Sequence, residues 1–231
     1  MTEYAPIPFA DHLKALKFKQ GEHIFISGST GSGKTTIARF VLERRSHVLA
    51  FSIKNRDSTL TTDYKDWSVV DNLNEVEPWM NRVLLWPRTK HGGGDEFLMH
   101  QREVLHDAFN QLLKANGWCL FIDELNYLSS PMHGGLSKQI EALQYIGRSS
   151  GISIVSAAQR PAYVPAACLT NSSHAYIGRT RFNSDLKRLA DFGDIDPTAT
   201  KQAIVSLPSK HDFLYLPTQG DGTPGIVNSR K

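Results

Sequence analysis

Short apolar runs alternate with stretches of helical periodicity along most of the chain. The apolar runs predict strands at Glu22–Ser27, His47–Ile53, Val83–Trp86, Trp118–Ile122, Ile152–Ala157, Ala175–Gly178 and Asp212–Leu216. Apolar residues three or four positions apart predict helices after Lys34 and over about Glu96–Ala115, Leu136–Ile146 and Ser184–Ala190. This alternation is typical of an α/β fold with a mainly parallel central sheet flanked by helices.

One turn between a predicted strand and a predicted helix is a complete phosphate loop of the form G-x-x-x-x-G-K-[ST]. Glycines allow backbone N–H groups and the helix N-terminus to face a phosphate. Lys34 is expected to reach the β- and γ-phosphates, and Thr35 to ligate Mg²⁺. The expected nucleotide-binding residues are Gly28, Ser29, Thr30, Gly31, Ser32, Gly33, Lys34, Thr35 and Thr36. The motif predicts a P-loop NTPase fold.

The apolar run Trp118–Ile122 ends in two acids, as a Walker B strand does. Asp123 is expected to hold the magnesium ion and Glu124 to act as general base toward water. Adjacent acids at a strand end also serve as helix N-caps, but the phosphate loop favours the catalytic interpretation. Glu124 favours hydrolysis, and the chain has no N-K-x-D guanine motif. The predicted activity is therefore ATP hydrolysis, with ATP and Mg²⁺ as cofactors.

A third segment, Arg148–Pro161, has an Arg-x-x-Gly turn, a strand of small and β-branched residues, and a Gln-Arg-Pro ending. Together with Gly21-Glu22-His23 and the later Arg179, Asp185 and Leu189, it resembles the FtsK/HerA superfamily of DNA-pumping ATPases. The resemblance covers most of residues 20–216. The size of the chain is similar to that of small viral genome-packaging ATPases within this superfamily.

The resemblance implies roles for individual side chains. Gln159 would be the polar sensor of the γ-phosphate, since a strand end beside the Walker B strand faces the ligand crevice of a parallel sheet. The alternative for Gln159 is a buried amide that satisfies loop backbone. An arginine from a neighbouring subunit would complete the site. Arg148 is the first candidate, and Arg179 and Arg181 are the next.

The resemblance also implies partners. These are DNA, contacted through its phosphate backbone, other copies of the chain in a ring, and a viral capsid portal or vertex. Two loops could contact DNA or could equally be solvated connections: Lys54–Lys65, with Lys54 and Arg56, and Arg88–Gly94, with Arg88 and Lys90. The alternative functions are a morphogenesis or secretion ATPase of the same superfamily and, further away, a nucleotide kinase or an ATP-dependent switch.

The charge distribution adds one observation. The net charge is +3, but Arg148–Arg188 holds six basic residues and one acid, which gives +5 and leaves −2 for the rest. This basic segment could meet nucleic acid phosphates, meet the nucleotide of a neighbouring subunit, or be a solvated face.

Length and composition limit the organisation of the molecule. The 231 residues, of which 40% are apolar and 21% charged, fit one globular domain. We expect an N-terminal extension at residues 1–20 and a single P-loop domain over residues 21–231. Cys119 and Cys168 are expected to be reduced and structural, and the histidines lack metal-ligand spacing. No apolar run is long enough for a membrane span, so a cytoplasmic or virion-associated protein is expected.

Overall fold

A single sheet organises the molecule. The computed structural model describes residues 4–54, 64–88, 94–190, 196–219 and 222–230. Within these residues the strand order is β1-β10-β9-β8-β2-β7-β6-β3-β5-β4. The strands are β1 (Pro6–Ile7), β2 (His23–Ser27), β3 (Val48–Phe51), β4 (Ser68–Val70), β5 (Arg82–Leu85), β6 (Cys119–Ile122), β7 (Ser153–Ala158), β8 (His174–Gly178), β9 (Asp212–Pro217) and β10 (Gly225–Asn228). From β8 to β4 all neighbours are parallel, whereas β9 is antiparallel to both β8 and β10.

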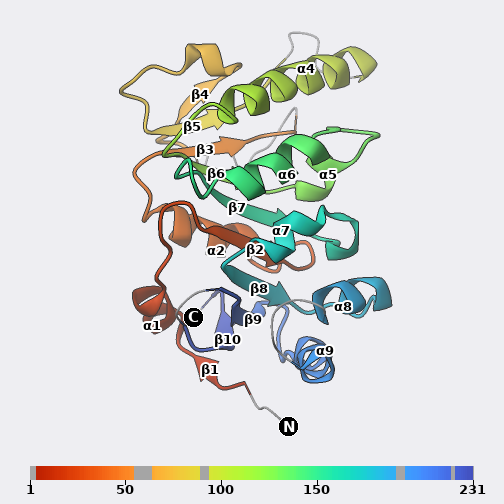
Figure 1. Ribbon diagram of the computed structural model, residues 1–231. Coiled ribbons are helices and arrows are strands. Elements are labelled where there is room, and N and C mark those ends of the chain that lie inside the picture. The colour runs from red at the N-terminus through yellow and green to blue at the C-terminus, as the bar shows by residue number, and fades with distance from the viewer. Residues whose placement is uncertain (1–3, 55–63, 89–93, 191–195, 220–221, 231) are drawn as a thin grey trace.

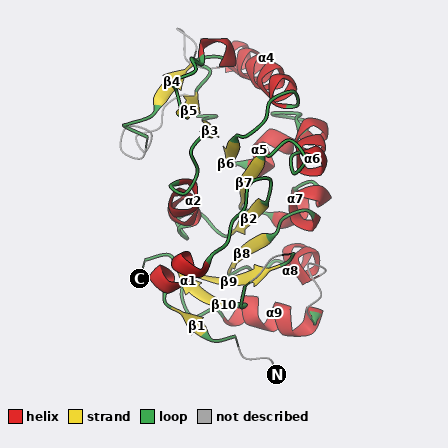
Figure 2. Ribbon diagram, turned by 60° about the vertical axis from the view of Figure 1, so that its left-hand side comes forward, coloured by secondary structure: helices red, strands yellow, loops and turns green. Residues whose placement is uncertain are grey.

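Helices cover both faces of this sheet (Figures 1 and 2). One face carries α1 (Phe9–Ala15) and α2 (Lys34–Leu42). The other face carries α4 (Gly94–Leu112), α5 (Leu125–Ser129), α6 (Ser137–Ile146), α7 (Ala166–Thr170), α8 (Asn183–Ala190) and α9 (Pro197–Ser206). Two short 3-10 turns, η1 (Leu73–Glu75) and η2 (Pro161–Tyr163), lie in connections.

Alternate residues of the central strands fill two separate cores. In β2, Ile24 and Ile26 pack in the core that includes Ile37 of α2, while Phe25 packs in the core beneath α4 to α9. Every residue of β2, β6 and β7 is buried, as expected for parallel strands covered on both faces. The buried strands therefore hold their carboxyl ends, where the phosphate loop begins, in fixed positions.

The predicted α/β fold with a mainly parallel sheet is confirmed. All seven predicted strands are present, with bounds shifted by at most two residues. The strands that the pattern missed, β1, β4 and β10, have two to four residues and lie toward the edges of the sheet. Such short segments carry too little alternation to stand out from loops. The helices α1, α5, α7 and α9 were also not predicted.

The first described residues belong to the same sheet as the rest. Pro6 and Ile7 pair in parallel with Ile226 and Val227 of β10. Phe9 of α1 is buried in the core that contains α2. Residues 4–20 thus pack against the end of the chain.

Buried polar groups accompany these contacts. His12 Nε2 of α1 lies 2.8 Å from the hydroxyl of Tyr176. His23 accepts a hydrogen bond from the backbone N–H of Ile154 at 3.1 Å. Burial lowers the pKa of both histidines from 6.5 to about 4. Both cysteines are free and buried, and burial raises the pKa of each thiol to about 12.

The two buried histidines predict a pH-dependent stability. An imidazole in the unfolded chain binds a proton below about pH 6.5, whereas His12 and His23 in the folded protein do so only below about pH 4. The free energy of unfolding should therefore fall as the pH is lowered through this window, by at most about 3 kcal/mol per histidine. Urea unfolding at several pH values measures this slope. His12→Asn should reduce the slope, and an identical slope in this variant would contradict the prediction.

Candidate functional site

The phosphate loop connects the carboxyl end of β2 to the start of α2. Gly31 and Gly33 have φ of 71° and 106°, in the left-handed region that glycine adopts without strain. The ammonium group of Lys34 donates to the carbonyl oxygens of Gly28 at 2.9 Å and Ser29 at 3.1 Å. The loop therefore encloses the lysine, and burial lowers the pKa of Lys34 against the opposing charges of Asp123 and Glu124.

The Walker B acids lie beside the phosphate loop. Thr35 donates its hydroxyl to the Asp123 carboxylate, with 3.3 Å to each oxygen. Two ligands on adjacent positions of an octahedral magnesium ion are about 3 Å apart. Thr35 and Asp123 thus fit a shared Mg²⁺, whose other ligands would be phosphates and water. No cluster of three His, Cys, Asp or Glu residues suited to a metal occurs within the described ranges.

Glu124 occupies the N-cap position immediately before α5, but its side chain does not cap that helix. Its side chain makes no capping hydrogen bond, which removes the structural alternative for this residue. Burial, followed by the charge of Asp123, raises the pKa of Glu124, while Lys34, Lys54 and a hydrogen bond from Gln159 oppose this shift. A half-buried carboxylate with a raised pKa is a suitable proton acceptor for an attacking water.

Gln159 connects the two motifs, because β7 lies between β2 and β6. Its Oε1 accepts a hydrogen bond from the hydroxyl of Thr30 at 3.2 Å. Its Nε2 faces Glu124 Oε2 at 3.5 Å. The Gln159 side chain is exposed and bonds to side chains, so it is not a buried amide that satisfies loop backbone.

The three candidate arginines lie at opposite edges of the sheet. Arg148 follows α6, and its backbone packs against Gly21, just before β2. Arg148 therefore lies at the edge of the sheet where the parallel strands begin, opposite the edge that carries the phosphate loop of the same chain. Arg179 and Arg181 follow β8 at the carboxyl edge. With Gln159 and residues 27–30 they line a cavity of about 550 Å³.

Three residues that sequence reasoning missed line the nucleotide pocket of about 320 Å³, namely His211, Ser229 and Arg230, and Lys54, which was considered for DNA contact, lines it as well. His211 Nδ1 lies 2.9 Å from the carbonyl oxygen of Ser32, and the hydroxyl of Ser229 donates to the same oxygen at 3.2 Å. A Cβ atom on Gly33 would come within 2.1 Å of Ser229 Oγ. The residues that precede an antiparallel strand share an edge with the carboxyl ends of parallel strands. That rule could have placed His211 beside the phosphate loop only if the position of β9 in the sheet and its antiparallel direction had been known.

The two loops considered for DNA contact are described only in part. Arg56 and Lys90 lie outside the described residues. Lys54 lines the nucleotide pocket. Arg88 forms an ion pair of 2.8 Å with Asp71. No helix in the described part of the chain is long and apolar enough to cross a membrane.

The fold and the paired motifs define a P-loop ATPase. The chain belongs to the AAA domain family, which it matches over residues 17–163. The genome packaging NTPase B204 of Sulfolobus turreted icosahedral virus 2 has a similar structure, with a TM-score of 0.62 at 15% identity over 91% of this chain and 98% of that chain. Structures of that NTPase contain sulfate, AMP, ATPγS or AMPPCP.

Two further solved structures share the fold. VirB4 of Thermoanaerobacter pseudethanolicus has a TM-score of 0.65 at 10% identity, over 89% of this chain and 88% of that one. EssC of Geobacillus thermodenitrificans has a TM-score of 0.57 at 13% identity, over 94% of this chain and 41% of that one. No curated protein matches the chain in sequence. The predicted resemblance to packaging ATPases is confirmed at the level of the fold.

The geometry around Glu124 predicts separate effects on binding and on hydrolysis. Glu124→Gln keeps the shape of the side chain but removes the proton acceptor, so kcat should fall by about 10² to 10⁴. The Kd for ATP should stay within about threefold of the wild type. Phosphate release and equilibrium nucleotide binding measure the two quantities. Glu103→Gln, on the exposed side of α4, is the matched control and should retain the wild-type kcat. Wild-type turnover in Glu124→Gln would exclude the general-base role.

Proposed function

We propose that this chain is an ATP-driven DNA translocase with an FtsK/HerA-type core, and that it acts as a viral genome-packaging motor in a homo-oligomeric ring. One observation carries the proposal: Gln159 bonds to both the phosphate loop and the Walker B glutamate. This sensor arrangement occurs in a fold shared with a packaging NTPase over nearly the full length of both chains. That packaging NTPase and this chain also have similar lengths.

Each residue of the site would have a separate role in the hydrolysis of ATP. Residues 28–36 would bind the phosphates through backbone N–H groups, and Lys34 would neutralise the charge that develops on the γ-phosphate. Thr35 and Asp123 would hold Mg²⁺, which supplies further neutralisation of the phosphates. Glu124 would take the proton of the attacking water while Gln159 orients that water.

A ring would supply the remaining positive charge from a neighbouring subunit. Arg148 lies remote from the phosphate loop of its own chain, as an arginine acting on the next subunit must. Arg179 and Arg181 line a cavity beside Gln159, which supports a role within their own subunit or toward DNA phosphates. Arg148 therefore stays the first candidate for the arginine that acts between subunits.

A morphogenesis or secretion ATPase of the same superfamily is the second candidate function. Its support is that the fold is not particular to the packaging NTPase, since the TM-score of 0.65 with VirB4 is as high as the 0.62 with that NTPase. The two candidates differ in whether DNA binds to the ATPase and accelerates its turnover.

A DNA translocase is expected to hydrolyse ATP faster when DNA is present. Because the contacts are made to phosphates, DNA affinity should fall steeply as salt is raised, on the order of 10³ between 50 and 200 mM for six or more contacts. ATPase rates with duplex DNA, single-stranded DNA and no DNA, each over a salt series, measure this. Turnover that is indifferent to both DNA forms would favour the secretion ATPase. Phosphoryl transfer to a small acceptor would instead indicate a kinase.

Mixing two inactive variants tests the arginine that acts between subunits. Lys34→Ala removes the phosphate lysine, and Arg148→Ala removes the candidate arginine, so each homo-oligomer should be inactive. In a mixed ring, an Arg148→Ala subunit with an intact phosphate loop can receive Arg148 from a Lys34→Ala neighbour, which should restore part of the ATPase rate. The same mixture with Arg179→Ala is the comparison. Mixtures with Arg148→Ala that stay inactive at all ratios would refute the assignment to Arg148.

A further inference from the structure

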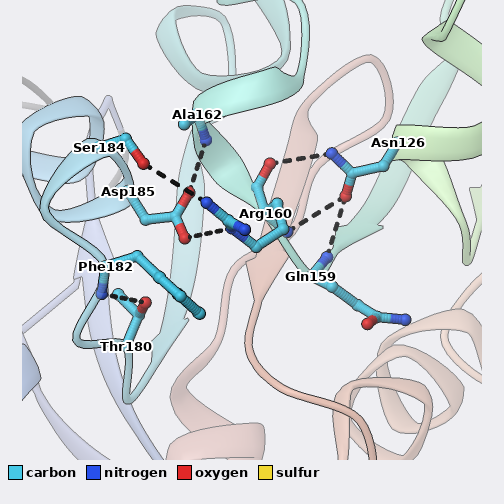
Figure 3. A network of polar contacts seen from close by, with 8 residues as sticks. All are labelled: Asn126, Gln159, Arg160, Ala162, Thr180, Phe182, Ser184 and Asp185. Carbon is cyan, nitrogen blue, oxygen red and sulfur yellow. Dashed lines mark hydrogen bonds and ion pairs between the residues drawn. The ribbon is translucent and has the colours of Figure 1, made fainter.

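The side chain of Asn126 joins α5, the helix that follows the Walker B acids, to the end of β7 through three hydrogen bonds. Its Oδ1 accepts from the backbone N–H groups of Gln159 at 3.1 Å and Arg160 at 3.2 Å. Its Nδ2 donates to the carbonyl oxygen of Arg160 at 2.9 Å. Figure 3 shows the amide facing this stretch of main chain. Asn126 therefore fixes the backbone of the γ-phosphate sensor relative to Glu124, two positions earlier.

The side chain of Arg160 points the other way, toward α8. Its Nε donates to Asp185 Oδ2 at 2.8 Å, and the side chain of Asp185 is fully buried. The second oxygen of Asp185 accepts from the backbone N–H of Ala162 at 3.0 Å (Figure 3). The guanidinium group lies over the exposed ring of Phe182, with 4.2 Å to its centroid.

The contacts from Asn126 through Arg160 to Asp185 each resist displacement. Both oxygens of a buried carboxylate are satisfied, so Asp185 cannot lose Arg160 without leaving an uncompensated charge in the interior. Asn126 uses three of its four hydrogen-bonding positions on the backbone of two successive residues. A displacement of Gln159 consequently displaces Arg160, and a displacement of Arg160 displaces α8.

We propose that Asn126, Arg160 and Asp185 form a mechanical relay between the γ-phosphate sensor and α8, in which Asn126 is a positioning residue for Gln159. The proposal rests on the ATPase function proposed above, and it adds residues that the phosphate loop and Walker B motifs do not include. In this relay Asn126 sets the place of Gln159 on the nucleotide side. Arg160 and Asp185 carry the change in position to the surface that includes α8 and Phe182.

The first experiment separates positioning from binding. Asn126→Ala should lower kcat by about 10², the loss that follows when a catalytic group is misplaced by roughly 1 Å, while the Kd for ATPγS stays within about threefold. Ser129→Ala is the matched control, because Ser129 lies in the same helix and loses a buried hydrogen bond to Leu125 that does not involve β7. This control should keep the wild-type kcat. If Asn126→Ala keeps the wild-type kcat, or if weaker binding accounts for its whole loss, the relay is refuted.

The second experiment is a double-mutant cycle between residues that do not touch each other. Asp185→Asn should lower kcat in the wild type, but it should have no further effect, within about twofold, once Asn126 has been replaced by alanine. Effects that multiply in the double variant would mean that the two residues act independently and would overturn the relay. Asn126→Ser replaces Asn126→Ala in the cycle if the alanine variant does not fold.

A third measurement keeps the relay testable apart from the proposed function. Amide hydrogen exchange of α8 should change when ATPγS binds to the wild type and should stay unchanged in Asn126→Ala. A wild-type protein without ATPase activity would refute the proposed function, and the exchange of α8 would then decide the relay alone. Equal changes in the wild type and in Asn126→Ala would refute the relay even if ATP is hydrolysed.

Discussion

The site depends on the pairing of β7 between β2 and β6. Parallel register matches Ser27 with Ala158, so β2 and β7 end together, and it matches Ile122 with Ser156, so β6 ends two residues earlier and its acids lie alongside the end of β7. The residues that follow these ends are the phosphate loop, the Walker B acids and Gln159. A slip of one residue in β7 would turn the side chain of Gln159 to the opposite face and break its bonds to Thr30 and Glu124. The sheet order thus creates a three-part site from segments whose contacting residues are 35, 88 and 129 positions apart.

The local motifs of this site were predictable from sequence, while its assembly was only partly so. The phosphate loop and the Walker B acids each lie within one short segment and carry their chemistry in their residue types. Gln159 could be assigned because a resemblance supplied the strand order. Asn126 could not, since an asparagine in a helix has many uses and its partners lie 33 and 34 positions away. The edge occupied by Arg148 likewise becomes visible only when the direction of each strand is known.

Arg160 shows how one residue can serve two needs. Its main chain continues the sensor strand and is held by Asn126, whereas its side chain neutralises the buried Asp185 and covers Phe182. Part of the positive charge of the basic segment Arg148–Arg188 therefore neutralises a buried acid of the same subunit. Of the other arginines in this segment, Arg179 and Arg181 line the cavity beside Gln159.

The contact of Ser229 with the phosphate loop has a consequence for biosynthesis. Ser229 bonds to Ser32 across 197 positions, and it fills the space next to Gly33. A ribosome needs roughly 10 to 40 s to add that many residues. For this interval the nascent phosphate loop exists without the hydrogen bond from Ser229 to Ser32.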